Sequence, residues 1–352
     1  MTRAAIVGTG FIARVHAIAL RAIGVEVAAV CGRNLAGAEG FGEGRPYDDL
    51  AALLDAEQVD VLHVCTPNDG HAAQALAALE RGIHVVCEKP VTVTTAESSA
   101  LVAAAAERGL VGATCYHARG YPLVEQMRAD TAGGVIGQVT FVHGRYVCDD
   151  ALFPASGWRV DPARSGPSYV VADLGTHWLD LAEHVTGLHI TAVAADFRSF
   201  SGGPLEDYAT LLLRFGDEMS GSLVLSAGVA GRKNQLLFEC EGTTGGLTWD
   251  QEEPTTLLAR GVGVAPRLVV KDPATNAPSA RGLSRYPAGH GEGYGGAFQN
   301  LFRSVYAAIA GEPHDPFPTF ADGHRGVALV EAAVASAQAS GRWVAVSPAP
   351  KL

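Results

Sequence analysis

Residues 3–13 of the chain, Arg3-Ala4-Ala5-Ile6-Val7-Gly8-Thr9-Gly10-Phe11-Ile12-Ala13, decide the fold of its first third. The apolar run over 3–7 is typical of a short buried strand, and it ends in a turn with two glycines. A helical pattern follows over 11–22. The order of strand, glycine turn and helix predicts the beginning of a βαβ unit.

The glycine turn has the residue types that a bound pyrophosphate requires. Gly8 permits the tight turn, Gly10 lets a phosphate approach the backbone, and Ala13 lets the helix pack closely on the strand. The start of the helix, at Phe11 and Ile12, would direct its free N–H groups at the phosphates. We therefore expect a dinucleotide to bind at this turn, the alternative being a glycine turn without a ligand.

The rest of the first third continues the alternation of strands and helices. Apolar runs lie at 25–30, 59–65, 83–88 and 110–116, with helical patterns at 71–81 and 94–108. Thr94 or Thr95 is expected to cap the second of these helices, with Glu97 just inside it. Continuous apolar strands between helices are typical of a parallel sheet that is covered on both faces.

After about residue 118 the pattern changes. Helices are expected at 121–132, 173–186, 294–310 and 323–340, a strand at 139–149, an irregular stretch at 154–168, and successive antiparallel strands between about 190 and 260. The fold class is therefore α/β, with two domains. Residues 1–118 would form a Rossmann domain with a doubly wound parallel sheet that binds NAD(P), and residues 119–352 a substrate-binding and oligomerisation domain with a large open, mainly antiparallel sheet.

Composition excludes several classes of protein. The 26 Lys and Arg against 37 Asp and Glu give a net charge of −11, which disfavours nucleic acid and anionic membranes as partners. No apolar run reaches the roughly 18–20 residues of a membrane span, and the N-terminus lacks the features of a signal peptide. The 6 cysteines are scattered, without a C-x-x-C pair, so we expect reduced, buried thiols and a cytoplasmic location.

Cofactor type is expected to be decided at the end of the second strand, where the sequence is Val30-Cys31-Gly32-Arg33-Asn34. No Asp or Glu is present there to bind a ribose 2′-hydroxyl, whereas Arg33 could bind a 2′-phosphate. This slightly favours NADP over NAD. The alternative is that Arg33 is a surface residue without this role.

Two further strings follow the third and fourth apolar runs of the first domain. Thr66-Pro67-Asn68 with His71 comes after one run, and Glu88-Lys89-Pro90 after another. Ligands of open α/β sheets bind at the carboxyl ends of the strands, where both strings lie. We therefore include Thr66, Pro67, Asn68, His71, Glu88 and Lys89 among the expected cofactor-binding residues.

In the second domain, Asp173 and His177 are spaced i and i+4 on a predicted helix. Side chains at this spacing share one helix face, about 5–6 Å apart, and a carboxylate can orient an imidazole. Such a pair is either a structural contact or part of a catalytic group, and its spacing does not distinguish the two.

The strings GTGFIA (8–13), TPNDGH (66–71), EKP (88–90) and DLGTHWLD (173–180) occur in this order. Together they resemble the Gfo/Idh/MocA oxidoreductase family over nearly the whole chain. The resemblance implies a Rossmann domain, a second domain whose open sheet often forms a dimer interface, and NAD(P)-dependent interconversion of alcohols and ketones of sugars and cyclitols. Lys89, Asp173 and His177 match the motif residues of the family, whereas 165–169 departs from its usual Gly-rich run.

These three residues are the expected catalytic group. His177 can accept the hydroxyl proton while hydride leaves for the nicotinamide, and Asp173 would stabilise the imidazolium that forms. Lys89 would hydrogen-bond the reacting oxygen. The sequence leaves open whether Lys89 or His177 is the formal base.

Substrate contacts are expected from several polar and aromatic residues. They are Lys89, Arg119, Tyr146, Trp158, Arg159, Asp173, His177 and His290, with Asp149 and Asp150 as further candidates. Trp178 is interpreted as a core residue. His184 lies two turns beyond His177, too far to share a metal with it, and we predict no metal site.

The strand segments at about 208–215 and 222–229 carry apolar residues toward both faces, although helices can cover only one. This predicts a homodimer or homotetramer formed through the sheet. Two other functions remain open beside a dehydrogenase. One is a redox-neutral glycosidase, epimerase or eliminase that uses a tightly bound nicotinamide transiently through a keto-sugar, and the other is a non-catalytic sensor.

Overall fold

The computed structural model describes residues 2–152 and 157–347, so that residues 154–156 of the expected irregular stretch lie outside it. The chain forms two compact units. The first contains residues 2–117 and Tyr294–Val327, and the second contains Ala118–Gly293 and residues 328–347. The segment Tyr294–Val327, which the sequence analysis assigned to the second domain, therefore packs with the first.

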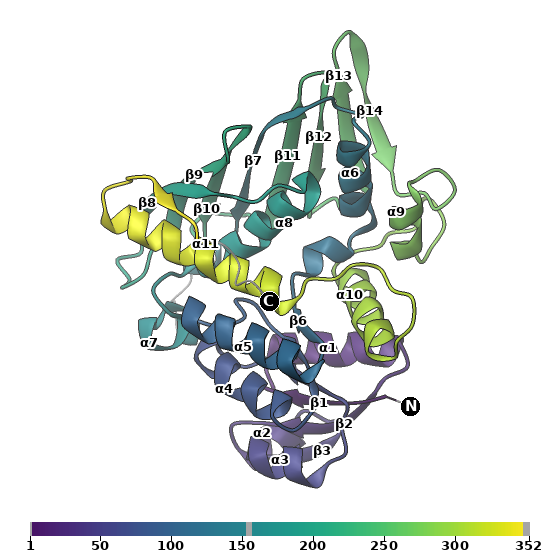
Figure 1. Ribbon diagram of the computed structural model, residues 1–352, viewed down its shortest axis with the longest axis vertical. Helices are drawn as coiled ribbons and strands as arrows, with labels where there is room; N and C mark the ends of the chain where they lie inside the picture. Colours follow the sequence, from purple (N-terminus) through teal and green to yellow (C-terminus); the bar gives the residue numbers. More distant parts are fainter. Residues whose placement is uncertain (1, 153–156, 348–352) are drawn as a thin grey trace. The chain divides into compact units, whose positions relative to one another are not determined.

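In its described residues, the first unit has a six-stranded parallel sheet (Figure 1). Its strands are β1 (Arg3–Val7), β2 (Glu26–Cys31), β3 (Arg45–Tyr47), β4 (Val61–Val64), β5 (His84–Cys87) and β6 (Gly112–Thr114). The order is β3-β2-β1-β4-β5-β6. Strand order therefore reverses between β1 and β4, and in such sheets ligands bind at the carboxyl ends of the strands beside this switch point.

Helices cover both faces of this sheet. They are α1 (Phe11–Ala22), α2 (Leu35–Glu39), α3 (Leu50–Ala56), α4 (Asn68–Leu79), α5 (Thr95–Arg108), α10 (Tyr294–Ile309) and the start of α11 (Phe320–Gln338). Thr94 caps α5 in a capping box with Glu97, as the sequence predicted. Phe298 and Phe302 of α10 are buried in the same core as Leu20 of α1, and this burial holds α10 in the first unit.

The second unit is built on a nine-stranded sheet in the described part of the chain. Its strands are β7 (Val139–Val147), β8 (Ala192–Arg198), β9 (Tyr208–Phe215), β10 (Met219–Ser226), β11 (Gln235–Gly242), β12 (Gly245–Asp250), β13 (Thr256–Gly261), β14 (Val264–Val270) and β15 (Val344–Ala345). The order is β14-β13-β12-β11-β7-β10-β9-β8-β15.

One pairing in this sheet differs from the expected run of antiparallel strands. β7 lies between β10 and β11, and it pairs with β10 in parallel. The chain leaves β7 through a helical connection before it enters β8, and a crossover of this kind brings a strand back in the same direction. The antiparallel pairs β8–β9 and β9–β10 then place β10 parallel to β7.

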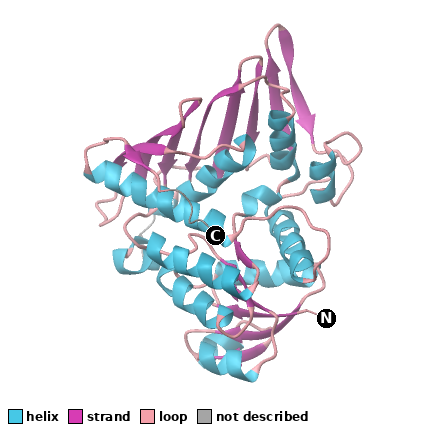
Figure 2. Cartoon of the chain, in the orientation of Figure 1, coloured by secondary structure: helices cyan, strands magenta, loops and turns pink. Residues whose placement is uncertain are grey.

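The helices of the second unit are mostly short. They are α6 (Pro122–Ala132), α7 (Pro162–Ser165), α8 (Thr176–Thr186), α9 (Pro278–Leu283), 3-10 turns at Asp150–Leu152 and Trp158–Val160, and a π-helical turn at Val171–Gly175. A further 3-10 turn lies at His117–Gly120. α6 and α8 pack on one face of the sheet, and Figure 2 shows long neighbouring strands in this unit.

Trp178 of α8 is fully buried and donates a hydrogen bond to the carbonyl oxygen of Leu237 on β11, which confirms that it is a core residue. The cysteines at 31, 65, 87, 115, 148 and 240 are all buried free thiols, as expected. Among the described residues, no helix has the length and apolar character needed to cross a membrane.

Candidate functional site

The glycine turn after β1 has the geometry of a phosphate-binding turn. Gly8 has φ of +111°, and a Cβ added there would lie 2.4 Å from the carbonyl oxygen of Cys65. Gly10 precedes the first residue of α1, and a Cβ added to it would meet no atom within 4 Å. Only glycine fits the first position, whereas the second leaves open space above the free N–H groups of the helix.

The end of β2 presents Arg33 as an exposed side chain. The neighbouring Asn34 differs from Arg33, because its side-chain oxygen accepts the N–H of Gly37 and caps α2. Two carboxylates from the turn after β3 lie nearby. Burial, together with Asp49 and Asp48, raises the pKa of Cys31 to about 11.

His71 connects the turns that follow β4 and β5. One ring nitrogen, Nδ1, lies 2.8 Å from the carbonyl oxygen of Pro90, and Nε2 lies 2.9 Å from that of Thr66. The ring is buried, and burial lowers its pKa despite these two contacts. His71 therefore contacts the protein backbone through both nitrogens, while Asn68 forms the first residue of α4 directly after Pro67.

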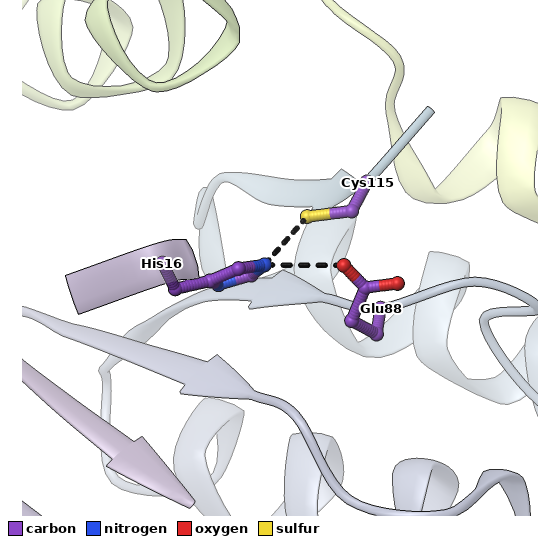
Figure 3. Close-up of side chains that lie close together, drawn as sticks. All are labelled: His16, Glu88 and Cys115. Carbon is purple, nitrogen blue, oxygen red and sulfur yellow. Dashed lines mark hydrogen bonds and ion pairs between the residues drawn. The ribbon is translucent and has the colours of Figure 1, made fainter. Parts of the chain in front are cut away.

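Lys89 is half-buried at the carboxyl end of β5. The adjacent Glu88 is buried, and its carboxylate accepts the backbone N–H of Lys89 at 3.1 Å. Its other oxygen, Oε1, lies 3.1 Å from Nε2 of His16 on α1 (Figure 3). Glu88 was expected to bind the cofactor. In the structure its two oxygens contact His16 and the backbone of Lys89, both within the first unit.

In the second unit, Asp173 lies in the π-helical turn, and the α-helix begins only at Thr176. The expected α-helix over 173–186 therefore begins later than predicted, because the backbone at Asp173 has the wider π-helical form. Such π turns are frequent at functional sites. The Asp173 carboxylate lies 3.3 Å from Nε of Arg159, an expected substrate residue, whose guanidinium lies over the ring of Trp158.

His177 is buried, with its ring centroid 6.1 Å from that of Tyr146. The hydroxyl of Tyr146 donates to the side-chain oxygen of Asn234 at 2.7 Å. Burial raises the pKa of Tyr146 well above its ordinary value, so that this hydroxyl is a donor at neutral pH. Tyr146 is thus fixed beside His177 by a residue that the sequence analysis did not consider.

Two other expected substrate residues have different surroundings. Arg119 is mostly buried, and its Nε donates to the carboxylate of Asp180 on α8 at 2.9 Å. This ion pair explains how a guanidinium can be buried at this point. His290 is exposed in the loop before α10, with its Nδ1 3.3 Å from the carbonyl oxygen of Ala288. Asp149 accepts a hydrogen bond from Lys233.

The turn before Asp173 depends on a residue that the sequence did not single out. Glu206, in the connection between β8 and β9, is 6 % exposed. Its carboxylate accepts hydrogen bonds from the hydroxyl of Ser168 and the backbone N–H groups of Tyr169 and Val171. The segment at 165–169, which departs from the family pattern, is therefore held by a buried carboxylate. Two adjacent acidic residues, Glu206 and Asp207, directly before an apolar strand were the only signal of this role in the sequence.

Two groups of side chains in the described part of the chain are close enough to share a metal ion. One is His16, Glu88 and Cys115, and the other is His143, Glu239 and Glu241. In the first, burial raises the pKa of Cys115 well above 9, which disfavours the thiolate that a metal requires. In the second, Arg260 already pairs with Glu241 at 2.7 Å. Ordinary hydrogen bonds and ion pairs account for both groups.

Comparison with known proteins agrees with the fold and with the ordered motifs. The model of an oxidoreductase family with an NAD-binding Rossmann fold matches residues 2–116, and the Gfo/Idh/MocA C-terminal domain matches residues 124–248. The chain is 28% identical to levoglucosan dehydrogenase of Pseudarthrobacter phenanthrenivorans, with 97% of each chain covered.

Two further proteins are also similar to this chain. D-Apiose dehydrogenase of Paraburkholderia graminis is 32% identical, over 70% of this chain and 66% of that protein. The crystal structure of an inositol dehydrogenase homolog from Azotobacter vinelandii, complexed with NADH and myo-inositol, matches with a TM-score of 0.89 and 31% identity, covering 98% of this chain and 97% of the other. The chain belongs to the Gfo/Idh/MocA family of oxidoreductases.

Proposed function

We propose that the protein is an NAD(P)-dependent dehydrogenase or ketoreductase. Its substrate would be a secondary alcohol or ketone of a sugar, a sugar derivative or a cyclitol. The observation that carries this proposal is the position of Lys89, which follows β5 at the same edge of the sheet as the glycine turn after β1. The names of the related levoglucosan and D-apiose dehydrogenases support the substrate class.

The residues of the first unit fit a dinucleotide. Gly8 has no room for a side chain, the space above Gly10 is open, and the first turn of α1 has no acidic residue to repel a phosphate. When bound, the nicotinamide supplies the hydride acceptor or donor. NADH bound in the related inositol dehydrogenase homolog supports this class of cofactor.

In the proposed reaction, the protein handles the proton of the reacting hydroxyl. His177 accepts it as the neutral imidazole, and the negative charge of Asp173 favours the imidazolium that forms. Lys89 donates a hydrogen bond to the oxygen as it becomes more negative, which stabilises the transition state. Tyr146 and Arg159 would then bind further substrate hydroxyls or orient the catalytic pair.

For cofactor choice we propose that Arg33 favours NADP. The last residues of β2 and the turn after it contain no acidic residue, and Arg33 is exposed there. A guanidinium binds a phosphate through paired hydrogen bonds, whereas a ribose 2′-hydroxyl is usually bound by a carboxylate.

We also propose that the chain forms a homodimer or homotetramer through the open face of the nine-stranded sheet. Phe141, Leu212 and Val224 point away from the face that α6 and α8 cover, and they are 44%, 49% and 37% exposed. Exposed apolar side chains on a broad sheet are typical of an interface. Light scattering at micromolar protein should give a dimer or larger species, and a monomer would contradict the proposal.

Activity is best tested with a panel of sugars and cyclitols, each with NAD and with NADP. Reduced nicotinamide is followed by its absorbance, in both reaction directions. Net reduction or oxidation of the cofactor with a member of the panel would support the proposed function. Substrate conversion without a net change in the cofactor, in a protein that retains its nucleotide through purification, would show a redox-neutral reaction instead. A protein that binds neither nucleotide would contradict the proposal altogether.

A further inference from the structure

A chain of buried polar groups lies beneath Lys89 in the first unit. It begins at the Tyr306 hydroxyl on α10, which lies 2.9 Å from Nε2 of His63 on β4. The Nδ1 atoms of His63 and His16 are 2.9 Å apart, and Nε2 of His16 lies 3.1 Å from Glu88. Glu88 in turn accepts the backbone N–H of Lys89. The proposed proton chemistry uses none of the first four residues.

The ionised carboxylate of Glu88 determines which nitrogen of His16 carries a proton. An ionised carboxylate can only accept hydrogen bonds, so Nε2 of His16 must carry a proton and donate it. Burial acts to raise the pKa of Glu88, but the hydrogen bond from His16, together with the charges of His16 and Lys89 and the N–H of Lys89, outweighs it and lowers the pKa. The two oxygens of Glu88 then accept from His16 on one side and from the peptide of Lys89 on the other.

The ring of His16 is itself held firmly. Its centroid lies 4.9 Å from that of Phe302, in an edge-to-face arrangement, and 5.6 Å from that of Phe298. Cys65 approaches Nδ1 of His16 at 3.3 Å, and Cys115 approaches Nε2 at 3.6 Å, the latter shown in Figure 3. Because His16 is completely buried among these groups, it gives Glu88 a fixed partner rather than a mobile one.

A second histidine contacts the backbone one residue beyond Lys89, at Pro90. Nδ1 of His71 lies 2.8 Å from the carbonyl oxygen of Pro90, and Nε2 lies 2.9 Å from that of Thr66. Burial lowers the pKa of His71, so the neutral ring carries one N–H and donates to one of these carbonyl groups; holding Pro90 requires that donor to be Nδ1. Lys89 thus lies between two backbone contacts that involve buried imidazoles. Its own N–H is bound by Glu88, the partner of His16, and the carbonyl group of the next residue, Pro90, lies beside His71.

We propose that His16 and His71 are positioning residues for Lys89, which hold the backbone on either side of it and so fix the direction of its side chain. His16 acts through Glu88, and His71 acts through the carbonyl group of Pro90. The inference rests on the proposed function in assigning Lys89 to the reacting oxygen. It goes beyond that function in giving a role to two histidines that need not contact substrate.

The test compares His16→Leu and His71→Leu with two conservative variants, His16→Gln and His71→Asn. The glutamine amide can still donate to Glu88, and the asparagine amide can still donate to Pro90. His84→Leu is the matched control, because His84 lies at the opposite end of β5 and its Nδ1 accepts a backbone N–H at 2.9 Å. Cofactor binding is measured by fluorescence titration and turnover by the nicotinamide absorbance.

Both leucine variants should lower kcat by about 10- to 100-fold, the effect expected when a catalytic group is misplaced by about 1 Å. Cofactor Kd should change much less, and the conservative variants should recover most of the rate. In a Lys89→Ala background, the leucine substitutions should cost less than about twofold, because they act through Lys89. Normal kcat in both leucine variants, with a large loss in Lys89→Ala, would overturn the positioning role and leave the proposed function intact.

Hydrogen exchange of the peptide that spans residues 84–92 gives a readout that does not require turnover. The Lys89 amide, which donates to Glu88, should exchange faster in His16→Leu, and exchange in this peptide should also rise in His71→Leu. It should stay unchanged at this end of the strand in His84→Leu. If wild-type protein shows no activity with any substrate, this measurement still decides the inference, since unchanged exchange in both variants would contradict it.

Discussion

The two units hold their candidate site residues in different ways. In the first unit, Gly8, Thr66 and Lys89 follow β1, β4 and β5, three neighbouring strands of one parallel sheet. In the second unit, the candidates are fixed by side chains far away in the sequence, such as Asp180 for Arg119 and Asn234 for Tyr146.

This difference has a physical origin. In a parallel sheet, the strand ends meet at one edge whatever the side chains are, so that residues after the strands come together by backbone geometry. Apart from Tyr146 on β7, the candidates of the second unit lie in a π turn, short helices and loops, and specific side-chain contacts are needed to fix such segments. We expect substitutions in the first unit to act through local backbone geometry and those in the second through loss of buried pairs.

The largest expected effect is on the rate of proton transfer, which substitutions in either unit should lower to a similar degree. His177→Ala and Lys89→Ala should each lower kcat by roughly 10²–10⁴, the range for loss of a general base or of its electrostatic support. Their effects should not add, because both residues serve one step. Steady-state kinetics with circular dichroism as the folding control measures this. Near-normal kcat in His177→Ala would show that this histidine is structural and leave Lys89 as the proton acceptor.

The buried ion pair of the second unit should give the largest loss of stability. Asp180→Ala leaves Arg119 buried without this partner, and removal of one member of a buried pair costs about 3–5 kcal/mol. The matched control is Asp55→Ala, which breaks the exposed pair of Asp55 with Arg81 and should cost below about 1 kcal/mol. Urea denaturation measures both. Equal losses in the two variants would contradict the view that buried pairs hold the second unit together.

In the first unit, substitutions at the two glycines of the phosphate turn should have different effects, on the stability of the fold at Gly8 and on cofactor binding at Gly10. Gly8→Ala should destabilise the fold by roughly 1–3 kcal/mol or more, because φ is positive and the new Cβ meets the backbone of Cys65. Gly10→Ala has free space around it and should keep its melting temperature while binding the cofactor more weakly. Calorimetry and nucleotide titration test the pair. A stable Gly8→Ala protein would show that the turn is less constrained than the geometry indicates.

A pH dependence of stability should arise from α6 and α8 of the second unit. Burial lowers the pKa of His184 to about 4, and Glu125, whose burial is outweighed by hydrogen bonds from His184 and Arg128, has its pKa lowered to about 2. The neutral His184 therefore contributes fully above pH 6.5, and this contribution is lost as the pH falls toward 4. The contribution of Glu125 is lost between about pH 4.5 and 2.

The free energy of unfolding should therefore decrease by roughly 1–3 kcal/mol as the pH falls from 7 to 4. Replacement of His184 by Gln should flatten the curve in that window, because the substituted side chain does not titrate. Denaturant titrations at a series of pH values measure both curves. Identical slopes for the wild type and His184→Gln would assign the dependence to other groups.

The smallest expected effect is on cofactor choice at the end of β2. If Arg33 binds a 2′-phosphate, Arg33→Asp should raise the KM for NADP about tenfold or more and improve the relative use of NAD, a tenfold change being about 1.4 kcal/mol. Arg45→Asp, on an exposed side chain of β3, is the matched charge-reversal control. An unchanged ratio of kcat/KM for NADP and NAD would remove Arg33 from the specificity of the site.

The sequence by itself determined the longer elements of the first unit and the places where its motifs lie. Strict features such as the glycine turn at 8–10 and the capping box at Thr94 depend on neighbours within a few residues, and local chemistry decides them. The short elements α2, β3 and α3 were not predicted, because segments of five, three and seven residues are too short to show a clear periodicity.

Only the tertiary structure decided which distant residues meet. Tyr294–Val327 joins the first unit because Phe298 and Phe302 are buried against α1, and β10 pairs with β7 because a helical crossover returns the chain in parallel. Glu88 was readable as part of a motif, but its contact with His16 spans 72 positions in the sequence. Periodicity shows which side of a strand or helix is apolar, whereas the partner of a buried polar group depends on how the elements pack.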